Sequence, residues 1–128
     1  MPKEIIQTNL APAPIGPYNQ AVKANGFIFI SGQIALDPVT GETVTSSIEE
    51  ETHLVMKNIA GILAEAKISF SHIVKTTILL SDMSLFAKVN EVYGSYFAEM
   101  PPARETFAVK GLPRGVNVEI STTAVVDL

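Results

Sequence analysis

Residues 73–80 read IVKTTILL, and this run decides how the chain around it is arranged. Apart from Lys75, its residues are β-branched, or leucine, and such a composition is typical of a β-strand. A nearly continuous apolar run indicates a strand that is buried on both faces. Other parts of the protein must therefore cover both faces of this strand.

The sequence predicts one helix before this strand and another after it. Residues 47–67 carry apolar side chains at helical spacing, and Ser47 followed by Glu50 has the spacing of a capping box. Residues 85–100 form the second expected helix. Its apolar side comprises Phe86, Val89, Val92, Tyr93 and Phe97. Each helix therefore presents one apolar stripe for packing on a sheet.

The remaining strands lie towards the two ends of the chain. Residues 21–32, AVKANGFIFISG, predict a hairpin because Asn25-Gly26 is a strong signal for a two-residue turn. Residues 104–109 and 116–126 predict two further strands, the last with alternating character. The predicted order is β-β-α-β-α-β-β, which indicates an α+β fold with a mixed sheet and both helices packed on one face.

Two helices cover only one face of such a sheet. The chain has 128 residues, 47% of them hydrophobic, and neither a linker nor a repeat, so residues 1–128 are expected to form a single domain. Its strands carry more apolar surface than the two helices can bury. We therefore expect another subunit on the open face, although the pattern does not give the number of subunits.

Composition and motifs argue against several classes of protein. The net charge of -4 and the lack of a basic cluster argue against nucleic-acid binding. The sequence has no cysteine, no membrane-length apolar run and no signal-peptide pattern, so a cytoplasmic location is expected. His53 and His72 lie far apart without acidic partners at ligand spacing, and neither a metal site nor a catalytic triad is predicted.

Arg104 and Glu119 are the charged residues for which the strand pattern predicts a role. In the last strand, successive side chains point to opposite faces of the sheet. Val118 suits the face that the helices cover, so Glu119 is expected on the other face, away from the helices. Phe107 suits the core, so Arg104 is expected on the open face as well. There Arg104 presents a fork that binds carboxylates, and Glu119 can transfer a proton. The alternative is that the two side chains pair with each other.

Five blocks of sequence resemble one protein family. They are IGPYNQAV (15–22), ISGQIALDPVTGE (30–42), IVKTTILLSDMSLFAKVNEVYGSYF (73–97), PPARETF (101–107) and LPRGVNVEI (112–120). In this order and spacing they cover nearly the whole chain and resemble the RidA/YjgF family of reactive intermediate deaminases. The resemblance implies a chorismate-mutase-like α+β fold, a homotrimer, and ligand clefts between neighbouring subunits.

The resemblance also implies an activity. Family members hydrolyse 2-imino acids such as 2-iminobutanoate and 2-iminopropanoate, with their enamine tautomers, to 2-keto acids and ammonia. Pyridoxal-phosphate-dependent serine and threonine dehydratases, the latter in isoleucine biosynthesis, release these reactive compounds. The implied reaction needs neither a metal nor a cofactor, because the iminium carbon is already electrophilic, and positioning is the main contribution expected of the protein.

The family's functional residues can be carried over position by position. Arg104 would bind the substrate carboxylate, assisted by the backbone N–H of Gly32. Glu119 would orient the attacking water and transfer a proton, and Tyr18 would line the cleft with its hydroxyl group. The other matching positions are Ser31, Asn90 and Thr106, the last through its backbone carbonyl.

The sequence departs from the family pattern beside the arginine. Glu105 and Thr106 stand where the family often has Ser or Thr followed by Cys, and Ser121 replaces a common acidic residue. Glu105 would weaken carboxylate binding if it turned towards Arg104. These departures bear on the rate and the substrate preference more than on the fold.

Two other functions remain open at this point. In the first, the same arginine binds a keto acid such as 2-oxobutanoate, and the protein is a non-catalytic regulator of branched-chain amino acid metabolism. The second, RNA cleavage, has been proposed for relatives. The negative net charge and the lack of a histidine pair argue against RNA cleavage here.

Overall fold

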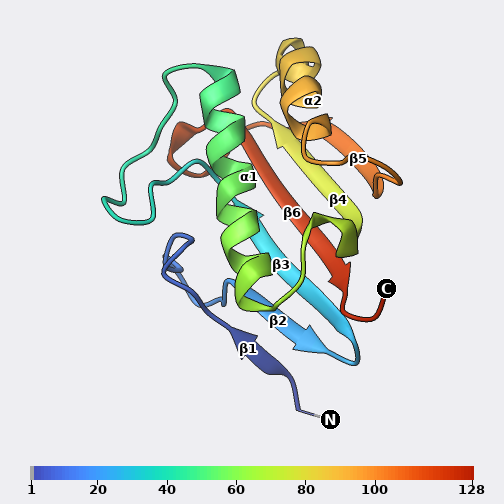
Figure 1. Ribbon diagram of the computed structural model, residues 1–128. Helices are drawn as coiled ribbons and strands as arrows, with labels where there is room; N and C mark the ends of the chain where they lie inside the picture. The colour runs from blue at the N-terminus through green and yellow to red at the C-terminus, as the bar shows by residue number, and fades with distance from the viewer. Residues whose placement is uncertain (1) are drawn as a thin grey trace.

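Both helices pack on one face of a six-stranded mixed sheet (Figure 1). The computed structural model describes residues 2–128. The helices are α1 (Ile48–Glu65) and α2 (Phe86–Gly94), and the strands are β1 (Glu4–Ile6), β2 (Ala21–Ala24), β3 (Phe27–Gln33), β4 (Ile73–Leu80), β5 (Ala103–Ala108) and β6 (Val118–Val125). The strands lie in the order β1-β2-β3-β6-β4-β5, and only β4 and β5 are parallel neighbours.

The order of strands and helices predicted between residues 21 and 126 is the order observed, but the prediction did not include β1. β1 has three residues and pairs antiparallel with β2, with Ile5 opposite Val22. Three residues are too few for an alternating pattern to be recognised, and the segment becomes a strand through its pairing with β2.

Helix α2 ends at Gly94, earlier than predicted. The hydroxyl of Ser95 donates to the carbonyl of Val92 at 2.5 Å, and the N–H of Phe97 bonds the carbonyl of Gly94. Met100 then adopts a left-handed backbone conformation with φ of 50°, and two prolines follow it. Neither feature is compatible with a continuing helix, so the chain turns back to begin β5 beside β4.

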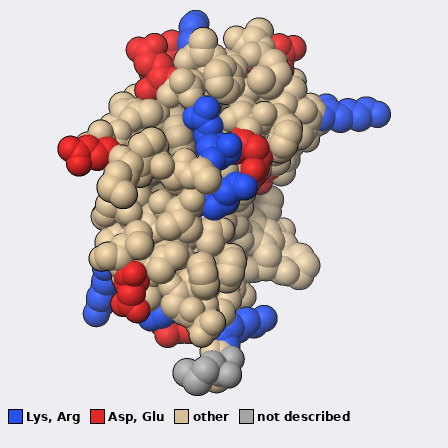
Figure 2. Space-filling model, turned by 90° about the vertical axis from the view of Figure 1, so that its right-hand side faces the viewer, with Lys and Arg blue, Asp and Glu red and all other residues tan. Residues whose placement is uncertain are grey.

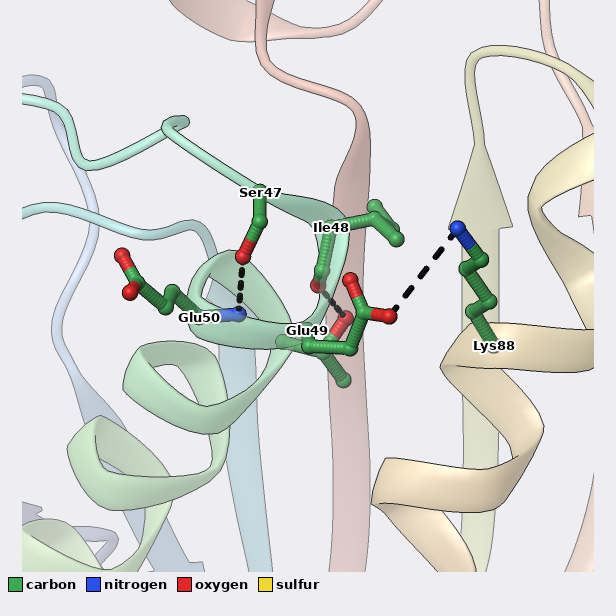
Figure 3. A network of polar contacts seen from close by, with 6 residues as sticks. Ser47, Ile48, Glu49, Glu50 and Lys88 are labelled. Atoms are coloured by element: carbon green, nitrogen blue, oxygen red, sulfur yellow. Dashed lines mark hydrogen bonds and ion pairs between the residues drawn. The ribbon is translucent and has the colours of Figure 1, made fainter.

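The start of α1 agrees with the predicted cap. The hydroxyl of Ser47 accepts a hydrogen bond from the N–H of Glu50 at 3.1 Å (Figure 3). In the same turn Glu49 lies 4.0 Å from the ammonium of Lys88 on α2. The cap contributes about 1 kcal/mol, whereas an exposed ion pair contributes about 0–1 kcal/mol. The cap is therefore what fixes the first residue of α1.

The hydrophobic core lies between α1 and the strands beneath it (Figure 1). Its largest fully buried apolar side chains include Ile28, Met56, Ile59, Ile62, Leu63, Ile78, Leu80 and Ile120. Gly61 lets the N-terminal segment cross α1 closely, because a Cβ there would lie 2.7 Å from the carbonyl oxygen of Leu10. Neither helix of residues 2–128 has both the length and the apolarity of a membrane span.

The opposite face of the sheet is open in the single chain. Phe27, Phe29 and Phe107 are 42%, 50% and 55% exposed, and Ile5 belongs to the same row of the sheet as Phe29. Strand β4 buries alternate residues, while Leu79 on its other side is only half-buried. The two-sided burial expected for β4 is thus incomplete within one chain, and the helices cover one face as predicted.

Candidate functional site

Glu119 lies on the open face of the sheet, against Gly32 of β3. The register between β3 and β6 shifts between Ile30 and Gln33, so Gly32 lies at an irregularity in the ladder. A Cβ at position 32 would lie 2.9 Å from Cδ of Glu119, so the glycine makes room for the carboxyl group. Burial raises the pKa of Glu119, because it disfavours the charged form. The group is therefore suited to accepting a proton.

Tyr18 lines the same hollow as Glu119, from the proline-rich loop. Its hydroxyl oxygen accepts a hydrogen bond from the N–H of Ile15 at 3.3 Å, which leaves the hydroxyl proton to donate to a ligand. The buried amide of Gln20 holds this loop by donating to the carbonyl of Pro12 at 2.9 Å. The loop is thus anchored from inside the protein, and Tyr18 has a defined position.

Ser31 supports this loop from β3. Its hydroxyl donates to the carbonyl of Asn19 at 2.6 Å, and its N–H donates to the carbonyl of Gln20 at 2.9 Å. The hydroxyl proton is therefore used within the protein. In this structure Ser31 holds the residues next to Tyr18 and contributes to the hollow through that contact.

Arg104 lies in a second cleft, on the side of the sheet that carries α2. The other residues that line it are Asn90, Tyr93, Gly94, Phe97, Pro101 and Pro102. Nη1 of Arg104 donates to Oδ1 of Asn90 at 2.7 Å, and its guanidinium carbon lies 5.6 Å and 5.2 Å from the ring centroids of Phe86 and Tyr93. These contacts orient the cation.

The charge of Arg104 is not neutralised by this environment. Asn90 is neutral, and within residues 2–128 Arg104 makes no ion pair with a carboxylate. Figure 2 views the side of the molecule at the β5 edge and shows basic side chains near the middle of this surface, with acidic atoms directly beside them. An oriented, unpaired guanidinium is arranged to bind an anion such as a carboxylate.

Tyr93 lines this cleft, whereas Thr106 is not among its lining residues. The hydroxyl of Tyr93 donates to Oγ1 of Thr76 at 2.9 Å, and burial raises the pKa of Tyr93. Thr106 is half-buried on the same face of β5 as Arg104, and its hydroxyl oxygen is buried without a hydrogen-bond partner. Tyr93 therefore supports the cation from below and is fixed in turn by β4.

Arg104 and Glu119 lie on opposite faces of the sheet, so the predicted common face is wrong. In the parallel pairing of β5 with β4, Arg104 lies opposite the fully buried Thr76. Phe107 and Glu119 both lie opposite Leu79, on the open face. The apolar character of Phe107 indicates a core position, but β5 is an edge strand whose outer face is uncovered in one chain. The alternative of a direct Arg104–Glu119 pair is contradicted as well.

Glu105 faces away from Arg104. Its carboxylate lies 2.6 Å from the ammonium of Lys75 and accepts a hydrogen bond from the hydroxyl of Thr77. The hydrogen bond from Lys75 is the main cause that lowers the pKa of Glu105, and the bond from Thr77 adds to it. The extra negative charge is thus held on the open face, where it does not compete for the guanidinium.

The two clefts offer complementary chemistry. One presents a carboxyl group of raised pKa, a phenol and a glycine backbone, and the other presents an oriented cation between aromatic rings.

The sequence pattern did not identify Phe86 as a support of Arg104, and it indicated helix packing as the main role of Tyr93. The available signal was Asn90, a polar residue at helical spacing between the apolar Phe86 and Tyr93. Residues 2–128 contain no group of three or more potential metal ligands.

Known proteins match this chain over nearly its whole length. The family model described as endoribonuclease L-PSP matches residues 8–126. A RutC family protein of Pyrococcus abyssi is 50% identical over 124 residues, covering 97% of this chain and 98% of that protein. The 2-iminobutanoate/2-iminopropanoate deaminase of Mus musculus is 47% identical over 123 residues, covering 96% and 91%.

A solved structure adds a ligand-bound relative. The crystal structure of E. coli TdcF with bound serine superposes with a TM-score of 0.91 at 37% identity, covering 95% of this chain and 98% of that one. The sequence matches extend from the loop before Tyr18 to the last strand, and so include every residue of both clefts. The chain therefore belongs to the RidA/YjgF family.

Proposed function

We propose that this protein is a 2-imino acid deaminase that hydrolyses 2-iminobutanoate, 2-iminopropanoate and their enamine tautomers to 2-keto acids and ammonia. The observation that carries the proposal is the guanidinium of Arg104, which Asn90 and two aromatic rings orient without neutralising it. A substrate with an α-carboxylate supplies the missing negative charge. The 47% sequence identity to the 2-iminobutanoate/2-iminopropanoate deaminase of Mus musculus supports the same reaction for this protein.

We propose further that each active cleft forms between two copies of the chain. β6 and β5 are separated by β4, which places their backbones about 10 Å apart at the usual strand spacing, and the two side chains also point to opposite faces. An imino acid with a short side chain cannot span the sheet. Arg104 of one copy and Glu119 of another can meet on one substrate, and the exposed Phe27 and Phe29 supply an apolar surface for association.

The family resemblance supports three copies, arranged as a homotrimer with their sheets inward. This arrangement covers the open face, which one chain leaves exposed. It also brings the hollow of Glu119 and Tyr18 towards the edge strand of a neighbour. A cytoplasmic location and a role in isoleucine biosynthesis stay predictions.

The reaction proceeds by addition of water to the C=N bond. Arg104 holds the carboxylate in a bidentate contact, and the backbone N–H of Gly32 contacts the same group. Glu119 accepts a proton from water as the oxygen attacks C2 of the iminium form, which gives a carbinolamine. Glu119 then returns the proton to nitrogen, the C–N bond breaks and ammonia leaves, and Glu119 accepts the proton of the carbinolamine hydroxyl as the carbonyl of the keto acid forms. Tyr18 donates a hydrogen bond from its hydroxyl group to the substrate or the water.

A coupled assay tests this function. A threonine dehydratase generates the imine, and semicarbazide traps the fraction that has not yet been hydrolysed. The protein should lower semicarbazone formation, and Arg104→Ala should not. Arg104→Lys keeps the charge but loses the planar fork, and we expect it to raise KM. No effect of the wild-type protein on semicarbazone formation would exclude the proposed activity.

A keto-acid-binding regulator is the second candidate. It is favoured by the fact that the contacts which orient Arg104 are complete within one chain and do not involve Glu119. Calorimetry with 2-oxobutanoate distinguishes the two. Binding that depends on Arg104, together with no deaminase activity, would replace the enzyme by the regulator.

A further inference from the structure

Glu51 is a fully buried carboxylate on the packed side of α1. Burying an ionised group is unfavourable unless hydrogen bonds or an opposite charge compensate it. Within residues 2–128 Glu51 makes no ion pair. Its compensation comes from hydrogen bonds to the chain that enters β6.

Three hydrogen bonds join Glu51 to two consecutive residues. Oε2 accepts from the backbone N–H of Asn117 at 2.7 Å and from the backbone N–H of Val118 at 3.1 Å. Oε1 accepts from the side-chain amide of Asn117 at 2.8 Å. The next residue in the chain is Glu119. The carboxylate thus holds the backbone immediately before the proposed proton acceptor.

The position of these bonds in the sheet gives them a specific consequence. The register of β3 with β6 ends at Gln33 opposite Ile120, so Val118 lies beyond that ladder. On the other side, the N–H of Ser81 donates to the carbonyl of Asn117 at 2.9 Å, and β4 pairs Leu80 with Val118. Glu51 therefore takes the place of a strand partner where β3 no longer provides one.

Register at this point decides where Glu119 projects. Successive strand residues point to opposite faces, so a slip by one residue would turn Glu119 from the open face towards α1. A smaller shift would move its carboxyl group relative to Gly32, where the fit is close. We propose that Glu51 is a positioning residue for the deaminase reaction, which sets the register and orientation of Glu119 through Asn117 and Val118.

The inference rests on the proposed function, but it makes a separate prediction. The chain places substrate binding and proton transfer on different elements. Arg104, with α2 and β5, and the N–H of Gly32 on β3 bind the carboxylate, whereas Glu119 on β6 transfers the proton. Loss of the Glu51 contacts should therefore lower kcat and leave keto-acid affinity nearly unchanged. A displacement of about 1 Å at a catalytic group lowers the rate by about 100-fold.

Two variants of Glu51 form a matched pair. Glu51→Met has a similar volume and no strong acceptor, so it loses all three hydrogen bonds. Glu51→Gln retains an oxygen for the two backbone N–H groups, and the amide of Asn117 can rotate to accept from the new NH₂ group. Asn117→Ala is an intermediate case, because it removes one of the three bonds.

The experiment measures kcat by the imine assay and the dissociation constant of 2-oxobutanoate by calorimetry, with the thermal midpoint and the oligomeric state as controls. We expect kcat to fall by about 10- to 100-fold in Glu51→Met, less in Asn117→Ala, and little in Glu51→Gln, with keto-acid affinity preserved in all three. Wild-type kcat in a folded Glu51→Met variant, or equal losses of kcat and keto-acid affinity, would overturn the inference. If Glu51→Met does not fold, wild-type kcat in Asn117→Ala has the same meaning. An inactive wild-type protein would count against the proposed function instead.

Discussion

Glu119 lies so close to Gly32 that the α-carbon of residue 32 has no room for a methyl group: a Cβ there would come 2.9 Å from Cδ of Glu119. The two residues belong to neighbouring strands and meet at the irregular part of the β3–β6 ladder. This relationship makes the position of the carboxyl group sensitive to a single methyl group, and it gives the first prediction.

Gly32→Ala should displace Glu119 and lower kcat by about 100-fold, since small misplacements of a catalytic group have effects of that size. The imine assay measures the effect. Gly111→Ala is the control, because a Cβ at position 111 meets nothing within 4 Å and kcat should stay unchanged. Normal turnover by Gly32→Ala would mean that Glu119 does not act from the position seen here.

The raised pKa of Glu119 predicts how stability depends on pH. Burial raises the folded-state pKa above the ordinary value of 4.5, so the folded protein binds the proton more tightly than the unfolded chain. Stability therefore falls as the pH rises from 4.5 through the folded-state pKa, and the cost is complete above it.

Glu119→Gln does not ionise and should therefore unfold at a higher temperature than wild type at pH 7. This gain in stability should vanish below pH 4.5, where the Glu119 carboxyl group of the wild-type protein is protonated and therefore as uncharged as the glutamine of the variant. Thermal unfolding at a series of pH values measures the difference. A variant that is less stable than wild type at pH 7 would show that the ionised carboxylate is favoured in the fold.

Glu105 should have little influence on the carboxylate clamp, because Lys75 and Thr77 hold it on the other face of the sheet. Glu105→Gln should change the dissociation constant of 2-oxobutanoate by less than about fivefold, which corresponds to the about 0–1 kcal/mol of an exposed charge pair. Asn90→Ala removes a hydrogen bond to the guanidinium and should weaken the same binding by about tenfold. A large gain in affinity on Glu105→Gln would place that carboxylate next to Arg104.

The sequence was a good guide to the elements and a poorer guide to the faces. Asn25-Gly26 forms the predicted turn, with φ of 52° and 83°, and Ser47 caps α1 as its spacing indicated. Both are local signals that depend on a few neighbouring residues. The alternation of β6 is equally local, and it placed Glu119 correctly on the face away from the helices.

The face of Arg104 could not be predicted in the same way. β5 is an edge strand, and its apolar Phe107 is exposed in one chain, so hydrophobicity did not identify the inner side. Glu51 is one of three acidic residues in the first turn of α1, a position that carboxylates favour whether or not they are buried. Its place on the apolar stripe, four residues before Val55, indicates burial, but its partners Asn117 and Val118 lie 66 and 67 residues further along the chain, and the sequence pattern does not reveal them.

The central claim is that Arg104 of one copy and Glu119 of another act on one substrate. It is tested most directly by combining two inactive variants, Arg104→Ala and Glu119→Gln, in one assembly by co-expression with different affinity tags. A cleft that receives its arginine from one variant and its glutamate from the other is intact. In a mixed trimer one of every three clefts is of this kind, so assemblies that carry both tags should regain about a third of the wild-type activity. Mixed assemblies with no more activity than the separate variants would contradict a cleft shared between copies.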